Sequence, residues 1–437
     1  MSAKLVYLLF IVSLIAYFIT GYQLNRSNFV LLITLYSFLF AIYFLILHHK
    51  NHINLPISII TGLIFRFSLL FCLPALSDDY YRFLWDGRLQ QLGINPFDYA
   101  PSQLAELTTD AFLRELYPKL NSPDYFSVYP QLLQYVFKLV VQIAGQSVIN
   151  AVIILKAIIF LFECGSIYLL IRLLKMKGLD PKNSLIYIFN PLVIIELTGN
   201  IHFEAIMIFF ILLSAYFISR SQIAGTVGAL TLAIQAKLIP VIAIPLLIKK
   251  VGFIKTVWIG FTCFLLFWIS SPFLWGGVER YLHFISSLQL YYGKFEFNGS
   301  IYSLFRGTGY WLTGFNQIYW TSKLLVLLTL ALFIYIYRSS KDFLQGFFWL
   351  MAAYLLFSAV VHPWYLAILV ALSPFVFYRF AMIWSALVPL TYITYSIIPY
   401  QQNYWIIGLE YCVVVAFVTF ESGFLKKGSQ IFDGQVS

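Results

Sequence analysis

Apolar segments recur along nearly the whole chain, and short polar or charged stretches separate them. The first three apolar segments cover residues 4–22, 28–47 and 56–76. An apolar helix of roughly 17–25 residues is long enough to cross a bilayer. The pattern therefore predicts an all-α, polytopic membrane protein with about 13–14 transmembrane helices. The further predicted spans lie near residues 148–173, 184–200, 203–219, 222–248, 252–271, 317–337, 342–361, 364–378, 380–398 and 403–420.

Composition agrees with this class and excludes a soluble globule. Hydrophobic residues make up 61% of the 437 residues and charged residues only 11%, and the mean hydropathy is +0.84. Soluble proteins have an apolar share of roughly 45–50%. No internal repeat or separate soluble region interrupts the pattern, so we expect residues 1–437 to form a single integral membrane domain.

The net charge of +10 does not indicate a nucleic-acid partner, because the basic residues are scattered at the ends of apolar segments. Basic loops of membrane proteins stay on the cytoplasmic side. The basic stretch 48–52 is therefore predicted to be cytoplasmic, and the polar stretch 77–127, one span later, to form an external loop. A loop of that length is usually functional. We expect a protein of the bacterial inner (cytoplasmic) membrane with its site on the periplasmic side.

The next apolar segment, 128–144, carries a polar stripe at spacings of three, four and four residues: Gln131, Gln134, Lys138 and Gln142. Such a stripe is typical of a helix that lies in the membrane interface. If this segment crossed the membrane, the following span would carry Arg172 and three lysines to the outside. We therefore expect 128–144 to be an interfacial helix, and 272–316 to be a second external loop.

The densest cluster of charge begins at Ser77, where the third apolar segment stops. Ser77 is predicted to cap a helix that has Asp78 and Asp79 in its first turn. Asp79, Arg82 and Asp86 then share one helical face, with Asp78 at its edge. A carboxylate is a suitable general base for a hydroxyl acceptor, and Arg82 is placed to be the cationic partner of the acidic pair. The alternative is a capped helix whose charges only face water.

Under this topology the external side collects most of the other unusual polar groups. Lys237 and Arg306 would suit the negative charge that develops on a phosphate leaving group. Lys237 is alternatively a residue that extends from a helix end toward water, and Arg306 an ordinary loop charge. The remaining candidate substrate-binding residues are Arg82, Asp86, Arg88, Tyr129, His202, Glu204, His362, Trp364 and Tyr365.

Several of these candidates have simpler interpretations. His202 and Glu204 can be residues of a hairpin tip, and His362 with its aromatic neighbours can belong to an interfacial aromatic belt. Oxygen ligands such as Asp79 with Asp86 or Glu204 would suit Mg²⁺ or Mn²⁺. No ligand spacing in the sequence requires a metal, so we expect no obligatory cofactor.

A series of motifs in this order resembles the bacterial mannosyltransferase-like integral membrane glycosyltransferases of the GT-C class. More distantly, the chain is similar to the phosphatidylinositol-glycan mannosyltransferases. Relatives often have Asp-x-Asp where this chain has adjacent aspartates, and His-Asn-Asp where it has His202-Phe203-Glu204. The motifs are Y-Y-R-F-L-W-D-G-R (80–88), G-I-N-P-F-D-Y-A-P (93–101), Y-P (129–130), N-P-L (190–192), G-N-x-H-x-E (199–204), A-x-L-I-P (236–240), N-G-S-I-Y-S-L-F-R (298–306) and H-P-W-Y (362–365).

The resemblance implies a fold whose first large external loop carries the catalytic aspartate. It also implies a polyprenyl-phosphate sugar donor, inversion at the anomeric carbon, and an acceptor hydroxyl on a lipid- or protein-linked glycan. Asp79 or Asp78 then takes the role of base, and Lys237 and Arg306 bind the donor phosphate. The sequence therefore predicts an inverting hexosyltransferase, specifically a mannosyltransferase, working among membrane lipids.

The main alternative is a transporter or flippase of lipid-linked oligosaccharides, which the broken segment around 235–245 would suit. Such a protein is expected to show inverted repeats and charges at mid-membrane. Another membrane transferase or polymerase acting on polysaccharide is a further alternative, which the motif positions separate only weakly.

Overall fold

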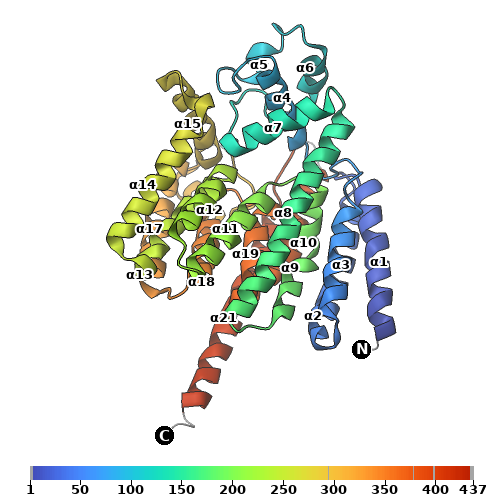
Figure 1. The fold of residues 1–437 in the computed structure, drawn as a ribbon, viewed down its shortest axis with the longest axis vertical. Coiled ribbons are helices and arrows are strands. Elements are labelled where there is room, and N and C mark those ends of the chain that lie inside the picture. The colour runs from blue at the N-terminus through green and yellow to red at the C-terminus, as the bar shows by residue number, and fades with distance from the viewer. Residues whose placement is uncertain (1–2, 294, 377, 397–398, 434–437) are drawn as a thin grey trace.

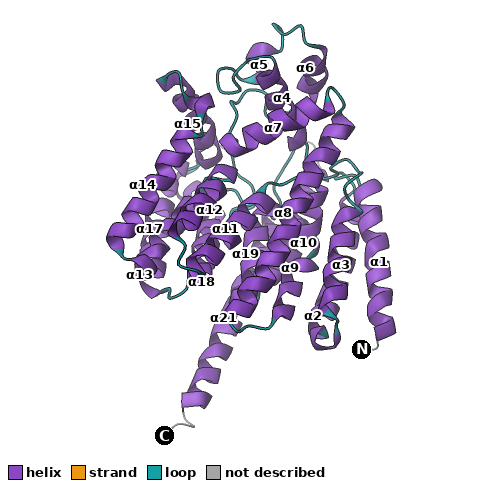
Figure 2. Cartoon of the chain, viewed as in Figure 1, coloured by secondary structure: helices purple, strands orange, loops and turns teal. Residues whose placement is uncertain are grey.

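A computed structural model describes residues 3–293, 295–376, 378–396 and 399–433 of the chain. Within these ranges the regular structure is helical throughout (Figure 2). The α-helices are α1 (Ala3–Tyr22), α2 (Phe29–His48), α3 (Leu55–Phe67), α4 (Asp79–Gln91), α5 (Pro101–Leu104), α6 (Ala111–Leu116), α7 (Gln131–Ala144), α8 (Val148–Met176), α9 (Leu185–Ile188), α10 (Pro191–Val193), α11 (Glu204–Ser219), α12 (Ile223–Ala236), α13 (Ile248–Val251), α14 (Phe253–Ile269), α15 (Val278–Gly293), α16 (Ile301–Thr313), α17 (Ile318–Ser339), α18 (Phe343–Phe357), α19 (Ala367–Leu372), α20 (Phe380–Leu387) and α21 (Tyr404–Asp433).

The protein is an all-α polytopic membrane protein. Among the residues that the structure describes, five helices are long and apolar enough to cross a membrane, namely α1, α2, α8, α17 and the first part of α21. A sixth span results if the strongly bent pair 191–199 and 204–219 counts as one. This is fewer than the 13–14 expected, because several predicted spans consist of shorter apolar helices of 10–17 residues. The segment 222–248, for example, changes from α12 to a 3₁₀ segment at Ile239–Leu247, where Pro240 and Pro245 prevent a regular α-helix.

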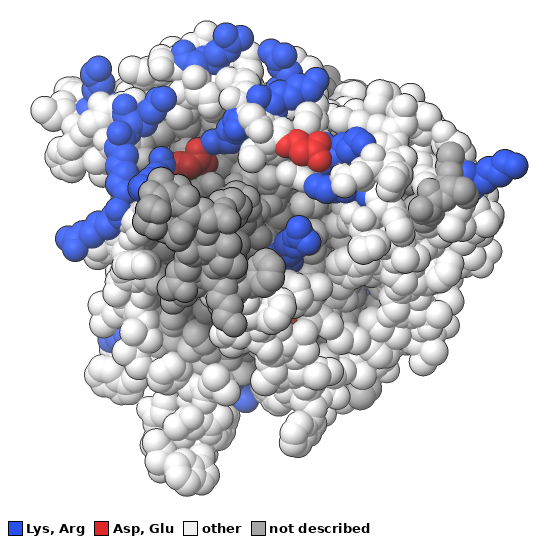
Figure 3. All heavy atoms as spheres, turned by 90° about the horizontal axis from the view of Figure 1, so that it is seen from below, with Lys and Arg blue, Asp and Glu red and all other residues white. Residues whose placement is uncertain are grey.

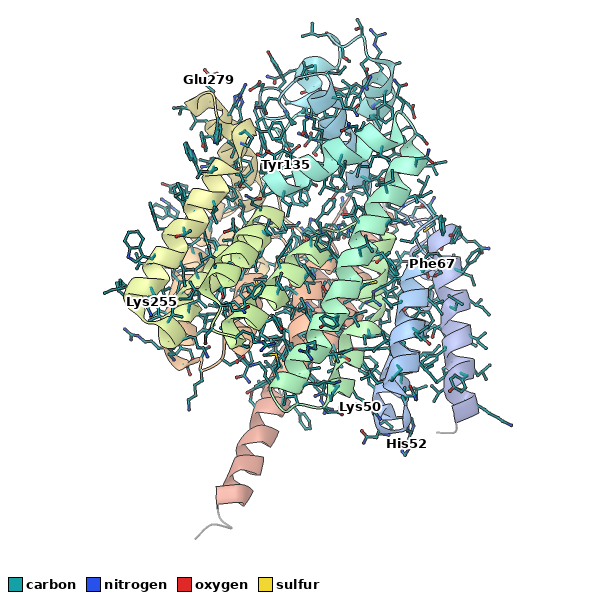
Figure 4. All side chains as sticks on the ribbon, in the orientation of Figure 1. Lys50, His52, Phe67, Tyr135, Lys255 and Glu279 are labelled. Atoms are coloured by element: carbon teal, nitrogen blue, oxygen red, sulfur yellow. The ribbon has the colours of Figure 1, made fainter. Side chains whose placement is uncertain are left out.

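The chain alternates between two ends of the bundle, and this alternation sets which loops meet. In Figure 4, Lys50 and His52 lie at the lower end, whereas Phe67, at the end of α3, lies near the upper end. The α1–α2 loop is also at the upper end, as the run of the two helices shows (Figure 1). Segments far apart in sequence therefore meet above the bundle, where α4 to α7 form a separate layer.

Helix α7 lies across the end of the bundle and packs against α4 (Figure 1). The ring of Phe137 stacks on that of Phe83 with centroids 4.8 Å apart. The two helices approach so closely that a Cβ on Gly87 would lie 2.4 Å from the carbonyl oxygen of Phe137. In the polar stripe of α7, Gln131 and Gln134 are buried against the protein, whereas Lys138 and Gln142 are exposed. An exposed apolar stripe runs along α7 instead, formed by Tyr135, Leu139 and Ile143 at intervals of four residues.

The lower end of the molecule carries positive charge, beginning with Lys50 (Figure 4). Seen from below, Lys and Arg side chains are spread over this face and few Asp or Glu side chains are visible (Figure 3). This distribution is the one expected for the cytoplasmic side of a membrane protein. The layer formed by α4 to α7 is at the opposite end.

Buried ionisable groups inside the bundle have partners. The Arg66 Nε lies 2.6 Å from Glu163 Oε2, and both side chains are fully buried. Tyr187 donates its hydroxyl to the other carboxylate oxygen of Glu163. Lys156 donates to the carbonyl oxygens of Leu69 and Cys72 at 2.8 and 2.7 Å. Lys156 thereby binds carbonyl groups of the irregular segment that follows α3 and leads toward α4.

Candidate functional site

A cleft of about 540 Å³ lies between the upper layer and the bundle. Its walls come from segments far apart in the chain: residue 26, residues 76–82, 121–130, 204–207, 237–239, residues 288 and 295, residues 351–368, and residues 395 and 400. The charged residues that line it are Arg26, Asp78, Asp79, Arg82, Glu204 and Lys237. Its apolar lining includes Met207, Leu238, Ile239, Met351, Leu355 and Ile368.

The acidic pair stands at the start of α4 and faces the cleft. Asp78, and not Ser77 as predicted, occupies the N-cap position, and α4 begins at Asp79. The Ser77 hydroxyl accepts from the Asp79 N–H at 3.3 Å, so it still satisfies one of the free amides of the first turn. Asn121 donates its amide N–H to Asp79 Oδ1 at 2.7 Å. The two neighbouring carboxylates therefore sit in different surroundings.

The cationic partner of the pair is Arg26, which the sequence analysis did not select. Its Nη1 lies 2.6 Å from Asp78 Oδ2. Arg26 comes from the short α1–α2 loop, which the alternation of spans places at the same end as the start of α4. That alternation was available from the sequence and could have indicated Arg26.

Arg82 lines the cleft, but the prediction that it neutralises the acidic pair is wrong. Its Nε donates to Asp86 Oδ1 at 2.9 Å, and its Nη1 donates to the carbonyl oxygen of Tyr125 at 2.9 Å. A residue four positions further along a helix lies on the same face, which favours the pair with Asp86. Arg82 therefore joins α4 to the loop that returns toward α7.

Asp86 is fully buried and does not line the cleft, contrary to its predicted role in substrate binding. Besides Arg82, its carboxylate accepts from Ser127 Oγ at 2.5 Å and from Gln134 Nε2 at 3.0 Å. These partners hold α4, α7 and the connecting loop together. Asp86 stabilises the site from behind the cleft wall.

Arg88 is also outside the cleft. Its guanidinium lies 2.6 Å from Asp110 Oδ2, and the Asp110 side chain caps α6 by accepting from the Leu113 N–H at 3.0 Å. The hydrogen bonds from Arg88 lower the pKa of Asp110. Arg88 therefore orders the loop between α4 and α7, and its predicted contact with substrate is not supported by this geometry.

On another wall of the cleft, Lys237 and Glu204 form an ion pair. Lys237 Nζ lies 2.9 Å from Glu204 Oε1 and 5.7 Å from the centre of the Tyr365 ring. Glu204 is 3% exposed, and its second oxygen, Oε2, has no hydrogen-bond partner among the described residues. A buried carboxylate oxygen without a partner is costly, so this atom is a candidate acceptor for a ligand hydroxyl.

A sharp bend places Glu204 in this position. The π-helical segment Ile194–Gly199 precedes the bend, and the two parts of the chain meet at an angle of 113°. Ile201 at the bend has a φ of 63°, an unusual backbone conformation for a β-branched residue. Strained backbone of this kind is frequent at functional sites. The bend starts α11 next to the cleft with Glu204 in its first turn.

His202 is buried behind the cleft wall and does not line it. Its ring stacks on that of Trp364 with centroids 3.8 Å apart, and its Nε2 lies 3.5 Å from Glu196 Oε2. Trp364 in turn stacks on His362 at 4.4 Å. His202 therefore contacts the aromatic wall from behind.

His362, Trp364 and Tyr365 all line the cleft, as does Tyr129. Burial, together with the neighbouring His202 ring and Lys237 ammonium group, lowers the pKa of His362 to about 3. The imidazole is therefore neutral at physiological pH. These rings offer flat surfaces of the kind that stack against sugar rings, with Lys237 close to Tyr365.

Arg306 does not line the cleft, contrary to the prediction that it acts with Lys237 on one phosphate. It pairs with Glu296 at 2.9 Å, and its guanidinium stands over the rings of Tyr310 and Tyr404. The second external stretch was expected at 272–316, and residue 294 in it lies outside the described residues. The sequence could not show that α16 directs Arg306 toward Glu296 and α21.

The described part of the chain holds no group of three or more His, Cys, Asp and Glu side chains that could bind a metal ion. The oxygens of Asp86 are occupied by Arg82, Ser127 and Gln134. Asp79 and Glu204 remain as oxygen ligands that face the cleft.

The family described as alpha-(1->6)-mannopyranosyltransferase, N-terminal domain, matches residues 11–252, which is more than half of the chain. The chain belongs to this family. The matched residues include Arg26, Asp78 and Asp79 on one wall of the cleft and Glu204 and Lys237 on another. The resemblance inferred from the motifs is therefore confirmed.

Alpha-(1->6)-mannopyranosyltransferase A of Corynebacterium glutamicum is 23% identical over 196 residues. The alignment covers 44% of this chain and 36% of that relative, so the chain matches about a third of the relative's length. No solved structure matches. Both similarities are to mannosyltransferases, and neither supports the flippase alternative.

Proposed function

We propose that this protein is an inverting mannosyltransferase that uses a polyprenyl-phosphate sugar. It transfers the sugar to a hydroxyl of a lipid- or protein-linked glycan. The family supports the sugar and the reaction class. The observation that carries the mechanism is the cleft in which Asp79, Lys237 and Arg82 share an enclosed space with an apolar lining.

Asp79 is the proposed base. It accepts the proton of the acceptor hydroxyl as the oxygen attacks the anomeric carbon. The bond between that carbon and the phosphate oxygen breaks, and the electron pair leaves with polyprenyl phosphate. One attack from the face opposite the leaving group inverts the anomeric carbon, so a single carboxylate is sufficient.

Lys237 and Arg82 are the cations proposed to stabilise the leaving phosphate, because both line the cleft. Charge-assisted hydrogen bonds to a phosphate strengthen as negative charge develops on it. The apolar lining around Leu238 and Ile239 suits the first part of a polyprenyl chain.

The reaction is proposed to take place on the external face of a bacterial inner membrane. The basic face at the lower end of the molecule (Figure 3) is opposite the layer formed by α4 to α7, and this arrangement supports the proposed orientation. The exposed apolar stripe of α7, with Leu139 and Ile143, would lie against the lipid next to the cleft.

The proposal is tested by incubating the purified protein with labelled polyprenyl-phosphate mannose and a panel of glycan acceptors. We expect release of polyprenyl phosphate by the wild-type protein, and a loss of about 100-fold or more in kcat for Asp79→Asn with donor binding retained. Asp124→Asn is a matched control, because Asp124 is an exposed aspartate of the same loop that does not line the cleft. Full activity of Asp79→Asn would remove Asp79 from the mechanism.

A further inference from the structure

The α1–α2 loop contributes a charged side chain to the cleft. The Arg26 Nη1 lies 2.6 Å from Asp78 Oδ2, and the two side chains are 30% and 35% exposed. The guanidinium carbon of Arg26 also stands 5.6 Å from the centre of the Tyr395 ring. Arg26 is thus held between the acidic pair and a wall that comes from the other end of the sequence.

Asp79 is bound differently from its neighbour. Its side-chain hydrogen-bond partner is neutral: the amide of Asn121 donates to Oδ1 at 2.7 Å. Within the described ranges, no Lys, Arg or His nitrogen lies within 4.0 Å of its carboxylate. Of two adjacent carboxylates, one is therefore neutralised by a cation and the other is not.

This asymmetry matters for a base. Two carboxylates side by side repel each other, and one of them takes up a proton more readily unless a cation compensates the charge. The ion pair with Arg26 uses one oxygen of Asp78, Oδ2, and the hydrogen bond from Asn121 uses one oxygen of Asp79, Oδ1, so the two carboxylates differ in the charge of their partner. The same arginine therefore neutralises one carboxylate and compensates the charge that would otherwise repel the other.

We propose that Arg26 is a positioning residue that neutralises Asp78 and thereby reserves Asp79 as the proton acceptor. This inference rests on the proposed function, because it concerns the same reaction. It adds the first loop of the chain to the site and decides between two adjacent aspartates that the sequence left equivalent.

Other charged and titratable groups face the same space from the surrounding elements. Tyr395 lies next to the acidic pair and lines the cleft. Tyr80, next to Asp79 in α4, has a raised pKa because of burial. The remaining groups that line the cleft are Arg82, Tyr125, Tyr129, Glu204, Lys237, Tyr354, His362, Tyr365 and Tyr400.

The test is the pH dependence of kcat/KM for mannosyl transfer by full-length Arg26→Gln, Asp78→Asn and the double variant. In Arg26→Gln the uncompensated charge of Asp78 acts on Asp79. We therefore expect the acidic limb of the profile of kcat/KM against pH to lie about one pH unit higher for this variant than for the wild-type protein. The double variant removes the source of that repulsion, so its limb returns toward the wild-type position. Arg26→Lys keeps the positive charge and is expected to keep the wild-type limb.

A merely structural role for Arg26 predicts a uniform loss of activity without a shift of the limb. An unshifted limb in Arg26→Gln would overturn the inference, as would a double variant no closer to wild type than Arg26→Gln. If Arg26→Gln does not accumulate in the membrane, a comparison of kcat for Asp78→Asn and Asp79→Asn tests the inference instead. We expect Asp78→Asn to lower kcat by less than tenfold and Asp79→Asn by about 100-fold or more, and the reverse order overturns the assignment.

These outcomes separate the inference from the function on which it rests. If Asp79→Asn loses mannosyl transfer but Arg26→Gln keeps the wild-type pH profile, only the inferred role of Arg26 is rejected. Full transfer by Asp79→Asn rejects the proposed mechanism itself.

Discussion

Lys237 Nζ lies 2.9 Å from Glu204 Oε1, which joins the end of α12 to the start of α11 at the edge of the cleft. The pair is asymmetric, because Lys237 is 30% exposed at its side chain and Glu204 only 4%. A phosphate that enters the cleft can therefore reach the ammonium group, while the carboxylate holds the lysine in place from behind.

Lys237→Met is expected to weaken donor binding by a factor of about 10–150, since a hydrogen bond to a charged group contributes about 1.5–3 kcal/mol. The measurement is the Kd of polyprenyl-phosphate mannose for the purified protein. Lys138→Met is the matched control, because Lys138 is exposed on α7 outside the cleft. Equal donor affinity in the two variants would contradict a phosphate role for Lys237.

Asp86→Asn is expected to destabilise the upper layer of the protein. It leaves the guanidinium of Arg82, which is 6% exposed, without its carboxylate partner. Breaking a buried pair in this way costs about 3–5 kcal/mol. Limited proteolysis of the loop between α4 and α7 measures the effect, and faster cleavage is expected.

The control for Asp86→Asn is Glu115→Gln. Glu115 pairs with Lys119 at 3.0 Å on the exposed surface of the same layer. Exposed pairs contribute about 0–1 kcal/mol, so little change in cleavage is expected. Equal cleavage of both variants would show that Asp86 does not hold the layer together.

Glu163→Leu is expected to lower the stability of the bundle by about 3–5 kcal/mol, because Arg66 would remain buried without its partner. The double variant Arg66→Met with Glu163→Leu removes both charges and is expected to recover much of that loss. Thermal unfolding in detergent measures both effects. If the double variant is less stable than Glu163→Leu, the hydrogen bonds from Arg66 to the carbonyl oxygens of Gly62 and Ile188 contribute more than the ion pair.

The stability of the protein is expected to fall as the pH is lowered from 6.5 toward 3. His362 has a folded-state pKa of about 3, below its ordinary value of 6.5, so in this window the unfolded chain binds a proton that the folded chain does not. Stability from this group is complete above pH 6.5 and is lost by about 1.4 kcal/mol per pH unit below it. His362→Asn should flatten the pH dependence of the free energy of unfolding by that slope, whereas His52→Asn, an exposed change at the opposite end, should not.

The sequence predicted the class of fold and the main functional region for clear physical reasons. Span length is set by bilayer thickness, so α1, α2, α8, α17 and α21 follow from the apolar pattern alone. The acidic pair was placed at the start of a helix because carboxylates are favoured there.

Partner choice could not be predicted in the same way. Arg82 was assigned to the wrong carboxylate, although its spacing of four residues from Asp86 is visible in the sequence. The sequence could not show that Ser127 and Gln134 also reach the Asp86 carboxylate, because only the fold brings them near. Arg306 is separated from Lys237 because α16 packs against α17 and turns the guanidinium toward Glu296. Sequence spacing constrains contacts within one helix, but contacts between loops depend on how the whole bundle packs.

The cleft is lined by residues inside the part of the chain that the family matches and by residues beyond it. Residues 11–252, which the family shares, supply Asp78, Asp79 and Lys237, whereas the aromatic wall at 362–365 lies beyond that match. A substitution in either part can therefore change the same opening, because the charged groups and the aromatic rings reach it from separate stretches of the sequence.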